Sequence, residues 1–194
     1  MTNQGLFSAS SFSPKIILAS SSPRRQELLT CAGICFEIMH PVIDESPKPG
    51  ESIEELVMRL AYEKAAAVQM PNALVLGADT LVLAPNNTLI FSKPEDLSDA
   101  ARMLGILSGQ THTVMTGTCV LNNHTARQRI TRTAVTFRHL SPHTIDWYLN
   151  QNESMDKAGS YSAQGKGMSL IARIEGSYTN VIGLPLAEVL DDLS

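Results

Sequence analysis

Two neighbouring arginines near the start of the chain stand where an α-helix disfavours positive charge. In LASSSPRRQELL, Pro23 begins an expected helix, so Arg24 and Arg25 fall in its first turn. That end of a helix attracts anions, by about 0.3–1 kcal/mol per exposed charge. Its free N–H groups, the hydroxyls of Ser20 to Ser22 and both guanidinium groups would together bind a phosphate. In the alternative, Ser22 caps the helix and both arginines point to solvent.

An acidic residue interrupts the most apolar segment of the chain. ALVLGADTLVLA, residues 73–84, is rich in Val and Leu, which predicts a buried strand. Asp79 lies within it, with Thr80 beside it. An ionised carboxylate in such a strand costs several kcal/mol unless it is paired, binds a metal or opens onto a cleft. We therefore expect Asp79 to be paired with a cation, to bind a metal or to open onto a cleft.

Two lysines occupy positions that one anionic ligand would explain. Apolar residues recur with helical spacing over 52–69, and Lys64 falls on the apolar side of that expected helix. Its stem could instead run along apolar surface and carry the amine to water. Lys93 stands just before Pro94 and an expected helix over 97–107.

Two further carboxylates, Asp44 and Glu45, lie in the polar, proline-bearing segment VIDESPKPGES. Mg²⁺ binds through one or two carboxylates plus substrate phosphates, while lysine and arginine neutralise the remaining charge of a polyphosphate. The sequence therefore predicts a divalent metal cation, Mg²⁺ or Mn²⁺, held by Glu45, Asp79 and Asp44.

The expected elements alternate between strands and helices, which predicts an α/β protein. Strands are expected at 16–19, 35–39, 73–84, 112–121, 129–140 and 169–176, and helices at 23–33, 52–69, 97–107, 142–149 and 186–193. The segment 158–167 is Gly-rich and is expected to be a loop that can approach a ligand closely, and 177–180 is expected to be a turn.

Composition limits the classes of partner and compartment. The net charge of −4 argues against a stable nucleic-acid complex. Three cysteines without a repeated spacing fit free thiols and a cytoplasmic location. No segment has the apolar length of a membrane span, so we expect no membrane partner. Residues 1–14 are expected to form a flexible arm rather than a signal peptide.

Several motifs in sequence order make the chain similar to the Maf family of nucleoside triphosphate pyrophosphatases. These motifs are LASSSPRRQELL, VIDES, RLAYEK, LGADT, SKPED, LSGQTHTVMTG, KAGSYSAQGKG and VIGLPL. The resemblance runs from about residue 16 to 190. It implies one domain over 15–194, with a mixed twisted sheet flanked by helices, two lobes and a central cleft. It also implies that a nucleoside triphosphate is cleaved to monophosphate and pyrophosphate, which keeps unwanted nucleotides out of nucleic acid, and that a homodimer is one arrangement to test.

The resemblance also implies roles for individual residues. Asp79 would be the proton acceptor. The substrate would be bound by Ser20, Arg25, Glu45, Lys64 and Lys93. Three specificity positions, Arg24, Thr80 and Gln164, match the subgroup that hydrolyses dTTP and UTP, whereas the 7-methyl-GTP subgroup tends to have Trp, Gln and Glu there. A glutamine side chain offers the donor and the acceptor that thymine or uracil requires at O4 and N3–H.

Two other functions stay open at this point. A nucleotide-binding regulator of cell division or septum formation would hold nucleotides without turnover. A pyrophosphatase of the same fold could instead act on 7-methyl-GTP or on modified pyrimidine nucleotides. In the catalytic hypothesis, Asp79 or the metal activates a water molecule that attacks the α-phosphorus.

Overall fold

The computed structural model describes residues 14–87, 89–123 and 125–194. Its strands are β1 (Lys15–Ala19), β2 (Glu37–Met39), β3 (Ala73–Leu83), β4 (Ile90–Phe91), β5 (Thr111–Asn122), β6 (Thr125–Phe137) and β7 (Ile171–Glu175). Its α-helices are α1 (Pro23–Cys31), α2 (Ile53–Ala67), α3 (Leu97–Leu107), α4 (Pro142–Leu149), α5 (Tyr178–Ile182) and α6 (Leu186–Leu193). Three short 3₁₀ segments are η1 (Pro85–Asn87), η2 (Ala158–Ser160) and η3 (Gly165–Leu170).

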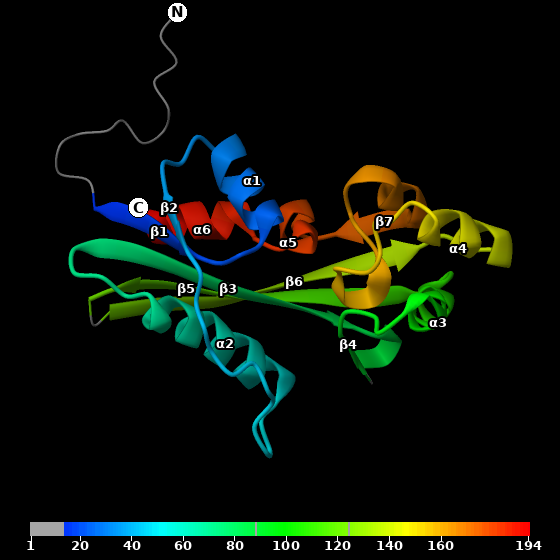
Figure 1. The fold of residues 1–194 in the computed structure, drawn as a ribbon, viewed down its shortest axis with the longest axis horizontal. Helices are drawn as coiled ribbons and strands as arrows, with labels where there is room; N and C mark the ends of the chain where they lie inside the picture. Colours follow the sequence, from blue (N-terminus) through cyan, green and yellow to red (C-terminus); the bar gives the residue numbers. More distant parts are fainter. Residues whose placement is uncertain (1–13, 88, 124) are drawn as a thin grey trace, which may run out of the picture. The chain divides into compact units, whose positions relative to one another are not determined.

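The strands form one mixed sheet in the order β2-β1-β3-β5-β6-β7, and β4 pairs with β3 (Figure 1). β1 is parallel to both β2 and β3, whereas the β3–β4 and β6–β7 pairs are antiparallel. The predicted α/β class, with a mixed sheet and flanking helices, is confirmed. None of the helices in the described ranges combines the length and the apolar character that crossing a bilayer requires.

The chain divides into two compact units. Of the described residues, the first unit contains those from 14 to 79 together with those in Thr116–Ile130 and Gly183–Ser194, and the second contains those in Thr80–Met115 and Thr131–Ile182. A single domain over 15–194 and a central cleft stay predictions. The predicted arm, residues 1–14, lies outside the described residues except for Pro14.

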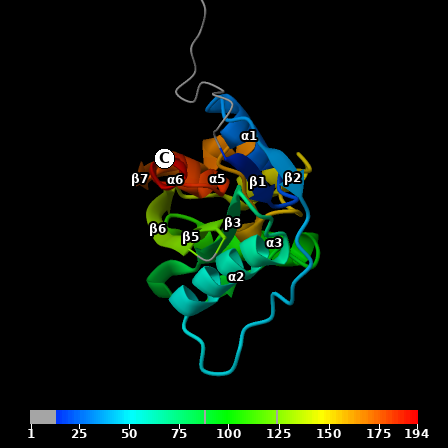
Figure 2. The ribbon, with the colours of Figure 1, turned by 90° about the vertical axis from the view of Figure 1, so that its left-hand side faces the viewer.

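In the first unit, α2 lies on one side of β1 and β3, and α1 and α6 lie on the other side (Figures 1 and 2). The apolar side of α2 packs onto the strands through a core that includes Ile17, Ala61, Ala65 and Val75. Ser52 caps α2: its hydroxyl accepts from the N–H of Glu55, whose carboxylate accepts from the N–H of Ser52. This core fixes the position of α2, and therefore of Lys64, relative to β3.

The close approach of α2 to β3 depends on Gly77. A Cβ at this position would stand 2.1 Å from the carbonyl oxygen of Ala61 and 2.8 Å from the amide nitrogen of Ala65. Backbone atoms cannot give way as a flexible side chain can, so we expect Gly77→Ala to lower the free energy of unfolding by about 1–3 kcal/mol. Denaturant unfolding measures this effect. The control is Gly105→Ala on α3, where a Cβ meets nothing within 4 Å. Equal stability of the two variants would contradict the expected clash.

In the second unit, α3 packs against α4 beside a core that contains Phe91, Leu104, Phe137 and Tyr148. α3 has the bounds that the sequence predicts, and the side chain of Asp96 caps it by accepting from the N–H of Asp99.

Several predicted boundaries need correction. β2 begins at Glu37 rather than residue 35, and β7 begins at Ile171 because Ser169 and Leu170 belong to η3. β5 is one residue longer at each end than expected, and β6 begins at Thr125 and ends at Phe137 rather than spanning 129–140. The predicted turn at 177–180 is wrong, because residues from Tyr178 form helix α5. The expected loop over 158–167 contains η2 and the start of η3.

Candidate active site

The first turn of α1 buries one of the two arginines. Arg25 Nε donates to the carbonyl oxygen of Gly183 (2.8 Å), and one terminal nitrogen donates to Ser20 Oγ (3.3 Å). Ser20 Oγ also accepts from the N–H of Ser22 (3.1 Å), while the side chain of Ser22 makes no capping bond. Arg24 is half-buried. The alternative is therefore wrong in two respects: the Ser22 side chain does not cap the helix, and Arg25 does not point to solvent.

Lys64 is the centre of the second group of charges. Its Nζ lies 2.6 Å from Asp79 Oδ1 and 2.9 Å from Glu45 Oε1. The side chains of Lys64 and Asp79 are 10% and 11% exposed, whereas that of Glu45 is 61% exposed. The ammonium group therefore does not run out to water, as the alternative for Lys64 supposed. It joins an inward-facing strand carboxylate to an exposed loop carboxylate.

Arg25 and the Lys64 group are close enough to interact electrostatically. Burial is the largest effect on the pKa of Arg25 and lowers it, and the positive charge of Arg24 lowers it further. The carboxylates of Asp79 and Glu45 act in the opposite direction and raise it. The structure thus brings Ser20, Arg25, Glu45, Lys64 and Asp79 together within the first unit. Buried cations beside a partly accessible carboxylate can bind phosphate oxygens and hold a base near them.

The donor set at Lys64 suits a hard divalent cation. Glu45 and Asp79 each direct a carboxylate oxygen at the ammonium of Lys64, and carboxylates of this kind, one or two together with substrate phosphates, are what Mg²⁺ commonly takes. Asp44 is occupied differently: its Oδ1 accepts from the N–H of Ser46 (2.9 Å), and this bond lowers the pKa of Asp44. Over the described ranges, no three His, Cys, Asp or Glu side chains are grouped so that they could hold a metal ion. Glu45 and Asp79 are oxygen ligands of the type that such a cation takes, but they are too few to hold it without further ligands.

Three predicted residues belong to the second unit. Thr80 follows Asp79 in β3 and is half-buried. Lys93 is exposed in the segment after β4. Gln164 precedes η3 and is half-buried, and its N–H donates to Ser162 Oγ (3.0 Å).

The loop around Gln164 is held by a residue that the sequence did not single out. The carboxylate of Glu153 accepts from the N–H of Lys166 (3.0 Å) and of Gly167 (3.2 Å). Tyr178 Oη donates to the carbonyl oxygen of Ala163 (3.0 Å) on the other side of Gln164. These bonds fix the backbone on both sides of Gln164. No spacing in the sequence marks Glu153, because its partners are backbone groups.

Comparison with known proteins identifies the family of the chain. The family description "Maf-like protein" matches residues 15–194. A dTTP/UTP pyrophosphatase of Moorella thermoacetica is 49% identical over 181 residues, covering 90% of this chain and 91% of the relative. The dTTP/UTP pyrophosphatases of Myxococcus xanthus and Shewanella oneidensis are 48% and 47% identical, covering 90% and 92% of this chain and 89% and 96% of the relatives. The chain therefore belongs to the family of Maf-like proteins.

Proposed function

We propose that this protein is a nucleoside triphosphate pyrophosphatase that hydrolyses dTTP and UTP to the monophosphate and pyrophosphate. One observation carries the proposal: Asp79 lies in an apolar strand, paired with buried Lys64, within electrostatic range of buried Arg25. A protein that only held nucleotides would need the cations but no carboxylate among them. The names of the relatives support the choice of dTTP and UTP.

The phosphates of the substrate would bind at Arg25, Lys64 and the first turn of α1. Arg25 and Ser20 are already joined, so the guanidinium group is oriented before substrate arrives. Pre-oriented cations of this kind lose little freedom when charge develops in the transition state. Lys93 is proposed to neutralise further phosphate charge.

In the proposed reaction, Asp79 accepts a proton from a water molecule whose oxygen attacks the α-phosphorus. A new P–O bond forms there, and the bond to the oxygen bridging the α- and β-phosphorus breaks, so that pyrophosphate leaves. Arg25 and Lys64 stabilise the charge that develops on the phosphate oxygens. A divalent cation at Glu45 and Asp79 would supply Lewis-acid polarisation of the phosphate.

A panel of nucleoside triphosphates tests this proposal. With Mg²⁺ or Mn²⁺ present, dTTP and UTP should release pyrophosphate rather than orthophosphate, and faster than GTP or 7-methyl-GTP. Tight binding of nucleotides without any product would favour the regulator of cell division or septum formation instead. A clear preference for 7-methyl-GTP or for modified pyrimidine nucleotides would assign the site to a different substrate.

Gln164→Glu should shift base preference away from UTP. A carboxylate loses the amide donor and adds a negative charge, which suits the donors of guanine better than the O4 of uracil. The ratio of kcat/KM for UTP to that for GTP measures the shift, and it should fall. Gln110→Glu, an exposed position after α3, makes the same chemical change as a control. An unchanged ratio in Gln164→Glu would refute the assigned role.

The remaining expectations are also proposals: a homodimer, a cytoplasmic location and the removal of unwanted nucleotides. Two of the three thiols, Cys31 and Cys35, are exposed and free, which agrees with a reducing compartment.

A further inference from the structure

The segment that carries Glu45 has little structure of its own. Between β2 and α2 the chain forms no helix or strand, and residues 44–50 are all exposed. The contact of Glu45 with Lys64 is a single ion pair whose loop partner is 61% exposed. Water screens the exposed Glu45 side of this pair, so the pair alone gives the loop limited support. Further contacts that hold the loop are found next to Glu45.

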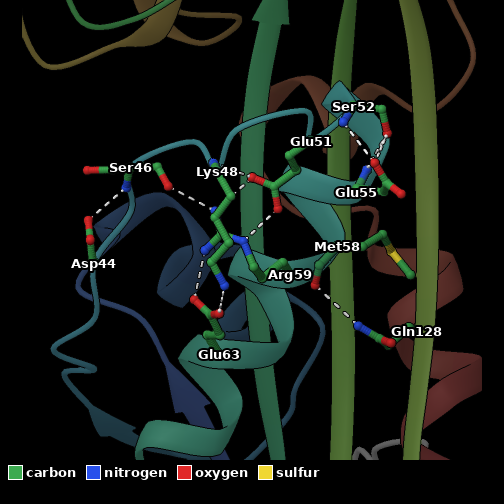
Figure 3. Close-up of polar contacts among 10 residues, drawn as sticks. All are labelled: Asp44, Ser46, Lys48, Glu51, Ser52, Glu55, Met58, Arg59, Glu63 and Gln128. Carbon is green, nitrogen blue, oxygen red and sulfur yellow. Dashed lines mark hydrogen bonds and ion pairs between the residues drawn. The ribbon is translucent and has the colours of Figure 1, made fainter.

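One guanidinium group on α2 contacts this segment at two points, Ser46 and Glu51 (Figure 3). Arg59 donates to Glu51 through Nε (2.6 Å) and a terminal nitrogen (2.9 Å), and to the carbonyl oxygen of Ser46 (3.0 Å). Its other terminal nitrogen donates to Glu63 (2.9 Å), four residues further along the helix. Glu51 in turn accepts from the N–H of Lys48 (3.0 Å). Arg59 thus ties Ser46, next to Glu45, to the same helix that carries Lys64.

The Arg59–Glu51 pair has the geometry of a strong contact. The side chains of Arg59 and Glu51 are only 14% and 9% exposed, and the pair is bidentate, the arrangement in which arginine–carboxylate contacts are strongest. The hydrogen bonds from Arg59 are the main reason that the pKa of Glu51 falls to about 2, so Glu51 stays ionised in acid that would protonate an ordinary glutamate. Lysine could not replace Arg59, because a single ammonium cannot fork to Glu51 and also reach Ser46.

We propose that Arg59 is a positioning residue of the active site. It fixes the loop between β2 and α2 so that Glu45 reaches Lys64 and the bound phosphates. The effect of Arg59 on catalysis rests on the proposed pyrophosphatase function. Its effect on the loop over residues 46–51 does not depend on that function.

A double-mutant cycle on hydrolysis of dTTP tests the catalytic part. If Arg59 acts through Glu45, Arg59→Ala should lower kcat/KM by about tenfold in the wild-type background and by less than about twofold in Glu45→Ala. Arg59→Lys should fall between wild type and Arg59→Ala, because it keeps the charge but not the fork. Arg102→Ala is the matched control, since it removes a helix-surface arginine paired with Asp99, and it should leave kcat/KM unchanged. Equal losses in both backgrounds, or no loss in either, would overturn the proposal.

Amide hydrogen exchange tests the physical part without any turnover. In Arg59→Ala, and also in Glu51→Gln, exchange at the amides of Ser46, Lys48, Gly50 and Glu51 should become faster while the amides of β3 keep their protection. Unchanged exchange in that loop overturns the proposal even if activity falls. If wild-type protein hydrolyses no nucleotide but the loop still loosens, the pyrophosphatase assignment fails and the role of Arg59 in holding the loop stands.

Discussion

The Asp79→Asn variant is expected to lose at least about a hundredfold in kcat with dTTP, while KM stays within the same order of magnitude. Asparagine has nearly the same shape and can still accept the bond from Lys64, so nucleotide binding should survive. Asparagine cannot accept a proton from water, so the chemical step should be strongly slowed. Steady-state kinetics with dTTP and Mg²⁺, alongside the free energy of unfolding, separates these two effects.

The control for this variant is Asp146→Asn, which removes an exposed carboxylate on α4. It should keep the wild-type kcat. Wild-type turnover by Asp79→Asn would show that another group accepts the proton. A large rise in KM at unchanged kcat would show that Asp79 contributes to binding rather than to the chemistry.

The second large effect is expected from Lys64→Met. Removing the ammonium leaves Asp79 nearly buried without its partner and beside the carboxylate of Glu45. Removing one partner of a buried ion pair typically costs 3–5 kcal/mol, so the free energy of unfolding should fall by about that much. Activity should fall as well, since a phosphate-binding cation is lost. Denaturant unfolding, with and without Mg²⁺, measures the change.

Added Mg²⁺ should recover part of the stability of Lys64→Met and have less effect on wild type, because two carboxylates without an ammonium between them attract a divalent cation. The double variant Lys64→Met with Asp79→Asn should be more stable than Lys64→Met alone, because it no longer leaves a buried charge unpaired. A single variant as stable as wild type would mean that the pair is not buried in solution. A lack of any Mg²⁺ effect would remove the support for a metal at Glu45 and Asp79.

The sequence predicts the elements whose local signals agree with their burial. α3 has the bounds expected from its apolar spacing, and the Asp96 cap makes its start recognisable. The segment after Gly176 misled the prediction, because its small polar residues are typical of turns. There the Ser177 hydroxyl accepts from the N–H of Asn180, and the buried Asn180 amide donates to Thr133 and to the carbonyl oxygen of Val114. Thr133 and Val114 lie far from Asn180 in the sequence, so no local pattern reveals these contacts.

The same distinction applies to the site. Asp79 and Lys64 stand out in the sequence because charge on an apolar strand or helix face is costly and needs a reason. Arg59 and Glu51 do not stand out, because charges on a helix surface and in a loop are ordinary, and only the folded chain shows that they meet. Glu153 is hidden for the same reason, since it binds backbone N–H groups. The sequence therefore predicts where charge is out of place, but not which residues hold the loops around it.

The central claim is that the water activated by Asp79 attacks the α-phosphorus of a pyrimidine nucleoside triphosphate. Hydrolysis of dTTP in water labelled with heavy oxygen, followed by mass spectrometry of both products, tests this claim directly. We expect the label in thymidine monophosphate and none in pyrophosphate. Label in the pyrophosphate, or release of orthophosphate in its place, would contradict the reaction proposed for this site.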